Sequence, residues 1–311
     1  MTARLADIIE QSTMLEESKM RQNEILFVEE ADRGVAYQTI AAMLRLGIKC
    51  KVRGADALTR VQPLQVLTSD DDSVNAVRGV SAYLKAPLAS LQSQAPLSEA
   101  EISLIRDDLQ EIPSTAHAVI VLPYTAKAAN VKRLFDAHDH TTVVVCPRVV
   151  GFRDEGLFAD TVAALRTQNG TKWEEIKARP PFAAITISDL CGFLVSVFWN
   201  KDLYKKTLVC PSQEVSPLEL LTQLESELEF QARSGERLLA KLRGFFSAAP
   251  KGSTTAAPTE SEVLQTLPSA QRILDSLPTT TTNFRAWTKK VSEHLERDPE
   301  SDLHFPPARS L

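Results

Sequence analysis

The sequence has few of the features that mark exported, membrane-spanning or nucleic-acid-binding proteins. It contains four cysteines, Cys50, Cys146, Cys191 and Cys210, and no CxxC pair, which predicts buried free thiols in a reducing compartment. No run of 18 apolar residues occurs, so no transmembrane span is expected. We expect no secretory signal in MTARLADIIEQ, because it is amphipathic and carries both charges. The net charge of −5 excludes a general cationic surface for nucleic acid.

The composition does support a globular core. Hydrophobic residues make up 43% of the 311-residue chain, which suits one large or two modest domains. After a helical extension over residues 1–22, the pattern over residues 23–90 predicts strands and helices in the order β-α-β-β-α. The predicted strands are EILFV (24–28), IKCKV (48–52) and LQVLT (64–68). The predicted helices are VAYQTIAAMLRL, which ends before Gly47, and VNAVRGVSAYLKA (74–86).

The second part, residues 91–246, is predicted to be all-helical. Ser98 and Glu101 form a capping-box pattern at one helix start. Within this part TTVVVCPRVV (141–150) is rich in strand formers and predicts a strand or a buried extended segment. Residues 247–260 predict a flexible linker, because they are mostly Ala, Ser, Thr, Pro and Gly. The tail, residues 261–311, is predicted to be helical or flexible.

This order of elements resembles the glutathione transferase superfamily, in which a thioredoxin-like domain precedes an all-helical domain. Pro63 lies where that family has a cis-proline at its third strand. ITISDL (185–190) is similar to the family's Ser/Thr-x-x-Asp box, with Thr186 capping a helix and Asp189 at its third position. The resemblance implies an α/β plus all-α fold and gives Pro63, Thr186 and Asp189 structural roles.

The residues that serve glutathione chemistry in that family are replaced here. Where an active transferase has a thiol-activating side chain, this chain offers Glu29, Glu30 and Asp32, which would raise the pKa of a thiolate. The pair that holds the peptide falls on Ala76 and Val77, which have no polar side-chain atoms. The resemblance therefore implies a catalytically degenerate protein with no catalytic residue, no cofactor and no metal.

Among degenerate branches, the chain looks most similar to metaxins and related sorting-and-assembly subunits of mitochondria. The segments PLQVLTSDDDSV and ITISDLCGFLVSVFW carry that likeness, together with a long insertion across about 110–155. It implies a scaffold subunit that binds other protein subunits, with a peripheral membrane contact, no transmembrane span and no nucleic acid. Two alternatives stay open: a scaffold of a cytosolic aminoacyl-tRNA synthetase or elongation complex, and a glutathione-dependent enzyme.

Two further patterns in the sequence bear on binding. His138 and His140 have metal-ligand spacing, but no second cluster accompanies them, so a solvated helix end is preferred. Apolar stripes on predicted helices of the chain's last third are candidate partner-binding surfaces. Their residues are Leu238, Leu242, Phe284, Trp287 and Val291.

Overall fold

The structure is a computed structural model that describes residues 24–30, 34–53, 67–69, 79–151, 160–161, 163–164, 170–227 and 258–277. The strands are β1 (Ile25–Val28), β2 (Lys49–Arg53), β3 (Leu67–Ser69), β4 (Ala82–Lys85), β5 (His117–Pro123), β6 (Thr141–Cys146), β7 (Arg148–Val150), β8 (Phe182–Thr186), β9 (Thr207–Val209), β10 (Gln213–Val215) and β11 (Ala270–Arg272). The helices are α2 (Gly34–Arg45), α4 (Leu88–Ser93), α5 (Glu99–Glu111), α6 (Ala128–Ala137), α8 (Gly170–Lys177), α9 (Ile187–Val197), η3 (Lys201–Leu203), α10 (Pro217–Glu227), α12 (Glu260–Thr266) and α13 (Ile273–Ser276). Within these ranges no helix is long and apolar enough to cross a membrane.

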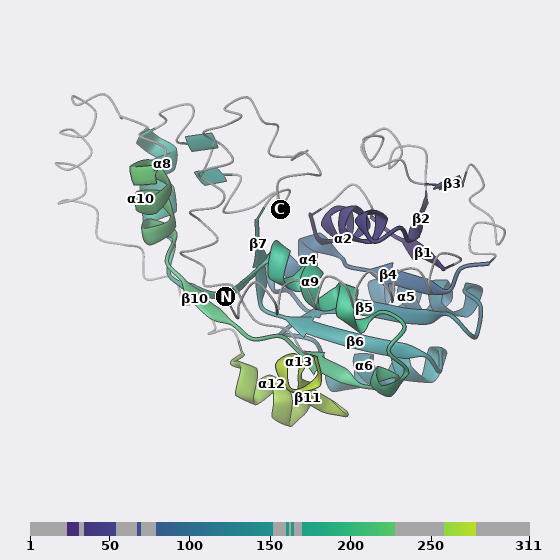
Figure 1. Ribbon diagram of the computed structural model, residues 1–311. Helices are drawn as coiled ribbons and strands as arrows, with labels where there is room; N and C mark the ends of the chain where they lie inside the picture. The colour runs from purple at the N-terminus through teal and green to yellow at the C-terminus, as the bar shows by residue number, and fades with distance from the viewer. Residues whose placement is uncertain are drawn as a thin grey trace, which may run out of the picture.

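Eight strands form one sheet in which all neighbouring strands are parallel (Figure 1). Their order is β11-β9-β6-β5-β4-β1-β2-β3. The chain starts in the middle at β1, runs outward to β3, returns to β4 beside β1, and continues to the opposite edge. This is the doubly wound, Rossmann-like topology, which places the carboxyl ends of all eight strands at one edge of the sheet.

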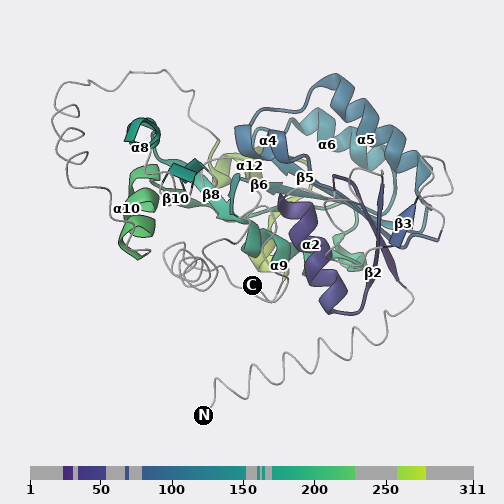
Figure 2. The same cartoon turned by 90° about the horizontal axis from the view of Figure 1, so that it is seen from above.

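Helices cover both faces of this sheet, so its strands are buried on both sides (Figures 1 and 2). Helices α2 and α9 pack on one face, where side chains such as Leu26, Leu84 and Val144 form a core with them. Helices α5, α6 and α12 pack on the other, where Phe27, Tyr83 and further strand residues form a second core. The result is a three-layer arrangement of helices, sheet and helices.

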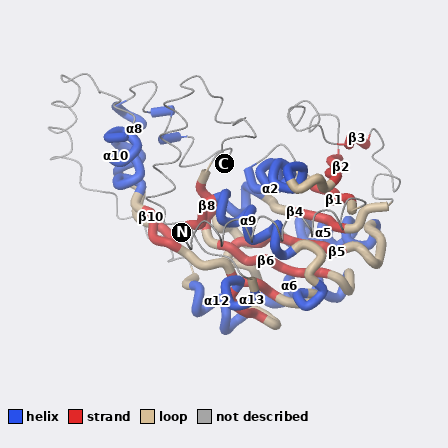
Figure 3. The backbone as a smooth tube through the Cα atoms, viewed as in Figure 1, coloured by secondary structure: helices blue, strands red, loops and turns tan. Residues whose placement is uncertain are grey.

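A smaller sheet lies beyond the carboxyl ends of β6 and β9 (Figure 3). Its order is β10-β8-β7, with β8 parallel to β7 and antiparallel to β10. A single residue, Pro147, separates β6 from β7, and β10 closely follows β9. Helices α8 and α10 lie side by side at its outer end (Figure 1). The smaller sheet therefore faces the carboxyl edge of the main sheet and can form one wall of a cavity there.

The predicted thioredoxin-like domain followed by an all-helical domain is wrong. Strands β5, β6, β9 and β11, all from the predicted helical part or the tail, join the sheet that begins with β1. All seven residues of β5 and all six of β6 are buried. A parallel strand covered on both faces is a continuous apolar run, which periodicity alone does not separate from a buried helix.

The predicted helix over residues 74–86 is the error with the largest consequence. Residues 82–85 are strand β4, which pairs with β1 and β5. Tyr83 lies in the α5-side core and Leu84 in the α2-side core, so the two side chains point to opposite faces of the sheet. Because β4 stands where the end of the predicted helix was expected, the β-α-β-β-α order that carried the family resemblance is lost.

Other local predictions are confirmed. Strands β1 and β2 and helix α2 form where expected, and Gly47 ends α2 with a positive φ of 77°. Ser98 and Glu101 make both hydrogen bonds of the capping box on α5. TTVVVCPRVV contains β6 and β7. The four cysteines are free and buried.

Candidate functional site

The carboxyl edge of the main sheet carries two groups of polar residues. The first follows β1 and β2, at the point where the strand order reverses between β1 and β4. The second lines a cavity beyond β5, β6 and β9, against the smaller sheet. Loops at this edge hold ligands in open α/β folds, so each place is a candidate site.

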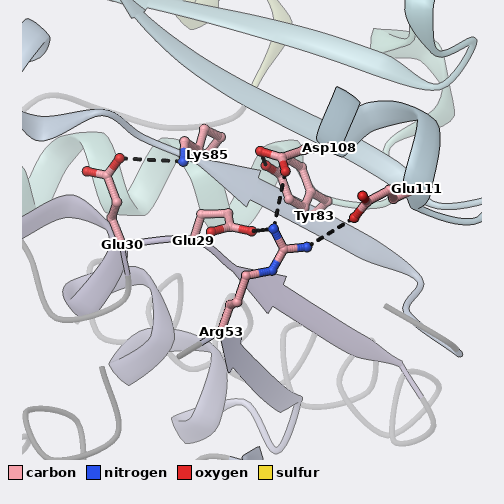
Figure 4. Close-up of polar contacts among 7 residues, drawn as sticks. All are labelled: Glu29, Glu30, Arg53, Tyr83, Lys85, Asp108 and Glu111. Carbon is pink, nitrogen blue, oxygen red and sulfur yellow. Dashed lines mark hydrogen bonds and ion pairs between the residues drawn. The ribbon is translucent and has the colours of Figure 1, made fainter. Parts of the chain in front are cut away.

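Arg53, at the end of β2, is the centre of the first group (Figure 4). Its Nη1 atom lies 3.2 Å from Glu29 Oε1 and 3.2 Å from Asp108 Oδ1, and its Nη2 atom lies 3.3 Å from Glu111 Oε2. The Glu29 contact is an ion pair without hydrogen-bond geometry, since Oε1 has no donor among the described residues. This single guanidinium therefore neutralises carboxylates from the β1 turn and from α5.

Neighbouring groups complete this charged cluster. Lys85 Nζ lies 3.5 Å from Glu30 Oε1, which ties β4 to the turn after β1. Burial raises the pKa of Glu29 above its ordinary value, although Lys85 and Arg53 act in the opposite direction. Burial also raises the pKa of Tyr83, whose neutral hydroxyl donates to Asp108 Oδ2 at 3.2 Å. The cluster is acidic overall, with four carboxylates against two cations.

The second group lines a cavity of about 1060 Å³, large enough for a small-molecule ligand. Its walls come from the segments after α4, β5, β6 and β9, and from β8 and the loop that precedes it. The lining residues are Ser93, Gln94, Tyr124, Thr125, Pro147, Arg148, Arg179, Pro180, Pro181, Phe182, Ala183, Ser212, Glu214 and Pro258. The cavity thus joins an apolar wall of prolines and Phe182 to a few charged side chains.

Gln94 fixes the wall that follows α4. It caps that helix in the left-handed region, with a φ of 54°. Its side-chain oxygen accepts from the Tyr124 backbone N–H at 3.1 Å, and its backbone carbonyl accepts from Thr125 Oγ1 at 2.7 Å. Its side-chain nitrogen donates to the Leu91 carbonyl at 2.8 Å. One residue therefore holds the end of α4 against the end of β5.

Tyr124 is a structural part of the cavity rather than a proton donor to a ligand. Its hydroxyl donates to the carbonyl oxygen of Cys210, which joins the end of β5 to the end of β9. The pKa of Tyr124 is raised far above its ordinary value, mainly by burial and to a smaller extent by nearby Cys210. The hydroxyl therefore stays neutral and engaged.

Several residues singled out in the sequence lie away from both sites. Thr186 caps α9 and accepts from the Asp189 backbone N–H at 3.0 Å, as the sequence predicts. His138 ends α6, with Nε2 3.1 Å from the Pro113 carbonyl oxygen, and among the described residues no cluster of three or more metal-binding side chains occurs. The remaining residues lie outside the described ranges: Asp32, Pro63, Ala76, Val77, Leu238, Leu242, Phe284, Trp287 and Val291.

Two residues singled out in the sequence, Glu29 and Glu30, lie in the first site, whereas sequence reasoning missed the other residues that build the two sites. Arg53 ends β2, and Arg148 opens β7 directly after Pro147 and the buried strand β6. A charged residue at the end of a strand-forming run is a signal that sequence inspection can detect. Gln94 and Phe182 have no such signal, because loop and strand packing alone brings them to the cavity.

No family model matches the chain, and no curated protein matches its sequence. Solved structures do match its fold. A dTDP-glucose 4,6-dehydratase from Bacillus anthracis in complex with NAD has a TM-score of 0.54 and 11% identity, with 89% of this chain and 98% of that chain covered. A yeast methylglyoxal/isovaleraldehyde reductase complexed with NADPH has a TM-score of 0.51 and 10% identity, covering 86% and 99%. An engineered reductase for asymmetric catalysis has a TM-score of 0.53 and 13% identity, covering 86% and 97%.

These likenesses show a shared Rossmann-like fold and correct the functional reading. The expectation of a non-catalytic, metaxin-like scaffold rested on a transferase fold that the chain does not have. The expectation that the chain is not an enzyme rested on lost glutathione positions in that same fold. Because the chain shares the fold of these solved proteins and not the transferase fold, both expectations are wrong in their premise.

Two of these proteins hold a nicotinamide dinucleotide, and in this fold the turn after β1 is where its pyrophosphate would lie. A pyrophosphate at this turn uses a G-x-G-x-x-G pattern that lets the backbone approach it closely. Residues 29–36 here read EEADRGVA, with one glycine, and Glu30 itself adopts a left-handed φ of 52°. Two carboxylates at the start of the turn would repel a pyrophosphate, and Arg53 is already paired. The turn does not fit a dinucleotide held in that manner.

Proposed function

We propose that this chain is an enzyme that acts on a small polar molecule bound in the cavity. The observation that carries the proposal is the cavity's position at the carboxyl ends of β5, β6 and β9, the edge at which Rossmann-like proteins bind ligands. The fold shared with reductases and a dehydratase supports an enzymatic role.

The lining suggests how the cavity would treat such a molecule. The hydroxyls of Ser93 and Thr125 already donate to backbone carbonyls, at 2.8 and 2.7 Å, so they shape the walls. Arg148 supplies positive charge, and Glu214 supplies a carboxylate that can take up a proton from a substrate. Phe182 and the neighbouring prolines offer an apolar surface for the rest of the molecule.

A variant that narrows the cavity tests the proposal. Ala183 lines the cavity on β8, paired with Glu214 of β10, and an indole there would obstruct the space beside these two residues. A screen of small polar metabolites, monitored by ligand-observed NMR, should find binders to the wild type that Ala183→Trp does not bind. Ala129→Trp places the same group on an exposed position of α6 outside the lining and serves as the control. Equal binding to wild type and Ala183→Trp would contradict the proposal.

Partner proteins and a peripheral place at a mitochondrial membrane remain predictions. Both rested on the corrected resemblance, and the residues proposed to bind partners lie outside the described ranges. The proposed function requires neither of them. Fractionation of cells followed by detection of the protein would test the location.

A further inference from the structure

Among the charged residues that line the cavity, Arg148 is the one that is not exposed. It opens β7, directly after Pro147, and its side chain is partly buried. Its Nε atom is buried, and none of the described residues provides it with a hydrogen-bond partner. A buried donor without an acceptor costs free energy, and a ligand oxygen would remove that cost.

Phe182 holds the guanidinium of Arg148 in a defined orientation. The Arg148 Cζ atom lies 4.4 Å from the centroid of the Phe182 ring, a cation–π contact. Arg148 pairs with Ala184 across β7 and β8, and Phe182 lies two residues before Ala184, on the same face of the sheet. A planar guanidinium that stacks through its face keeps the N–H groups on its edges available for a planar acceptor.

Arg179 adds a second positive charge to the same cavity. The pKa of Arg148 is lowered, mainly by burial and to a smaller extent by the positive charge of Arg179. The second effect is expected where two cations lie near each other and no anion offsets their repulsion fully. Arg179 is more exposed and pairs with Asp160 Oδ2 at 2.9 Å. Glu214 is the acidic lining residue, and it is exposed. The least exposed charge in the lining is therefore the positive charge of Arg148.

We propose that the cavity binds the oxyanion group of its substrate, a carboxylate or a phosphate, through paired hydrogen bonds from Arg148. Arginine is the side chain best suited to bidentate recognition of both groups. The apolar wall formed by Phe182, Pro180 and Pro181 would receive the carbon part of the same molecule. This inference rests on the proposed function, because it names the substrate class for the same cavity.

The test uses sodium phosphate, sodium acetate and neutral glycerol as probes at constant ionic strength, with binding measured by ligand-observed NMR. Wild type should bind phosphate, acetate or both more tightly than glycerol. Arg148→Gln should bind the preferred anion at least about tenfold more weakly, as expected for loss of a bidentate charged contact. Arg148→Lys keeps the positive charge but loses the paired N–H donors of the guanidinium. Its affinity for the anion should therefore lie between those of wild type and Arg148→Gln.

Controls separate the outcomes. Arg133→Gln removes an exposed arginine of α6 outside the lining and should leave anion binding unchanged. Thermal unfolding of each variant without ligand confirms that it is folded. Preference for phosphate or for acetate decides which oxyanion the substrate carries. Anion binding that survives Arg148→Gln, or no preference over glycerol, would overturn the inference. The proposed function can stand even if the inference about Arg148 fails. That result requires neutral molecules to bind the wild type and Ala183→Trp to block their binding.

Discussion

At the residue scale, His117 joins three elements at the amino end of β5. The Trp199 backbone N–H donates to Nδ1 at 2.9 Å, so that nitrogen carries no proton. Nε2 lies 2.8 Å from Thr142 Oγ1, and that hydroxyl donates to the Leu203 carbonyl at 2.8 Å. Nε2 is therefore the N–H of a neutral imidazole. The pKa of His117 is lowered to about 3, mainly by burial and to a smaller extent by nearby His140 and His138.

The lowered pKa predicts acid sensitivity. Because the folded pKa is below the ordinary value of 6.5, protonation favours the unfolded chain, and stability is lost as pH falls below 6.5. Between pH 7 and pH 5 the loss from this one group is about 2 kcal/mol. In urea unfolding, the stability advantage of wild type over His117→Gln should shrink by that amount. An advantage of equal size at both pH values would contradict the assignment.

Arg53 shows how a strand-end residue can change what a fold binds. In Rossmann-like folds the acidic or basic residue near this position meets the dinucleotide's ribose or 2′-phosphate. Here the guanidinium is held by Asp108 and Glu111 of α5 and by Glu29 of the β1 turn. The chain's own carboxylates thus occupy the contacts that a phosphate would need.

At the element scale, α9 starts within a buried part of the fold and depends on its cap. Thr186 is 3% exposed, and its hydroxyl accepts from the N–H of the third helical residue. Thr186→Ala should lower the free energy of unfolding by about 1 kcal/mol, because it leaves that N–H without an acceptor. Thr186→Ser keeps the acceptor and should lose less. Chemical denaturation checks both variants, and equal losses would show that methyl packing, not the cap, matters.

Local signals made some elements predictable. Ser98 with Glu101, Thr186 with Asp189, and Gly47 after α2 act within one helical turn, so the sequence is sufficient to place them. The state of residues 82–85 and 119–123 depends on strands far along the chain. Without β1 and β5 as neighbours, β4 reads equally well as part of a helix.

The cavity was beyond prediction for a related reason. Arg148 and Phe182 meet because β7 and β8 pair, and Gln94 meets Thr125 because α4 ends beside β5. No spacing in the sequence indicates these long-range contacts. The resemblance to the transferase order pointed instead to Pro63, Ala76 and Val77, none of which lies in the described ranges.

At the scale of the whole molecule, one continuous sheet carries both candidate sites on one edge. The acidic cluster after β1 and β2 and the positive cavity beyond β5, β6 and β9 are separated by the middle of that edge. Strand β11, from the tail, pairs with β9 and extends the sheet. We therefore expect ligand binding on one side of the sheet's switch point and a structural role on the other.

Hydrogen exchange measured by mass spectrometry, with and without a ligand found in the metabolite screen, tests this assignment most directly. We expect slower exchange in peptides that contain Thr125, Arg148 and Phe182, with no change in peptides that contain Glu29 and Glu30. Protection at the turn after β1, without protection around Arg148, would show that the ligand binds in the dinucleotide position and would contradict the account.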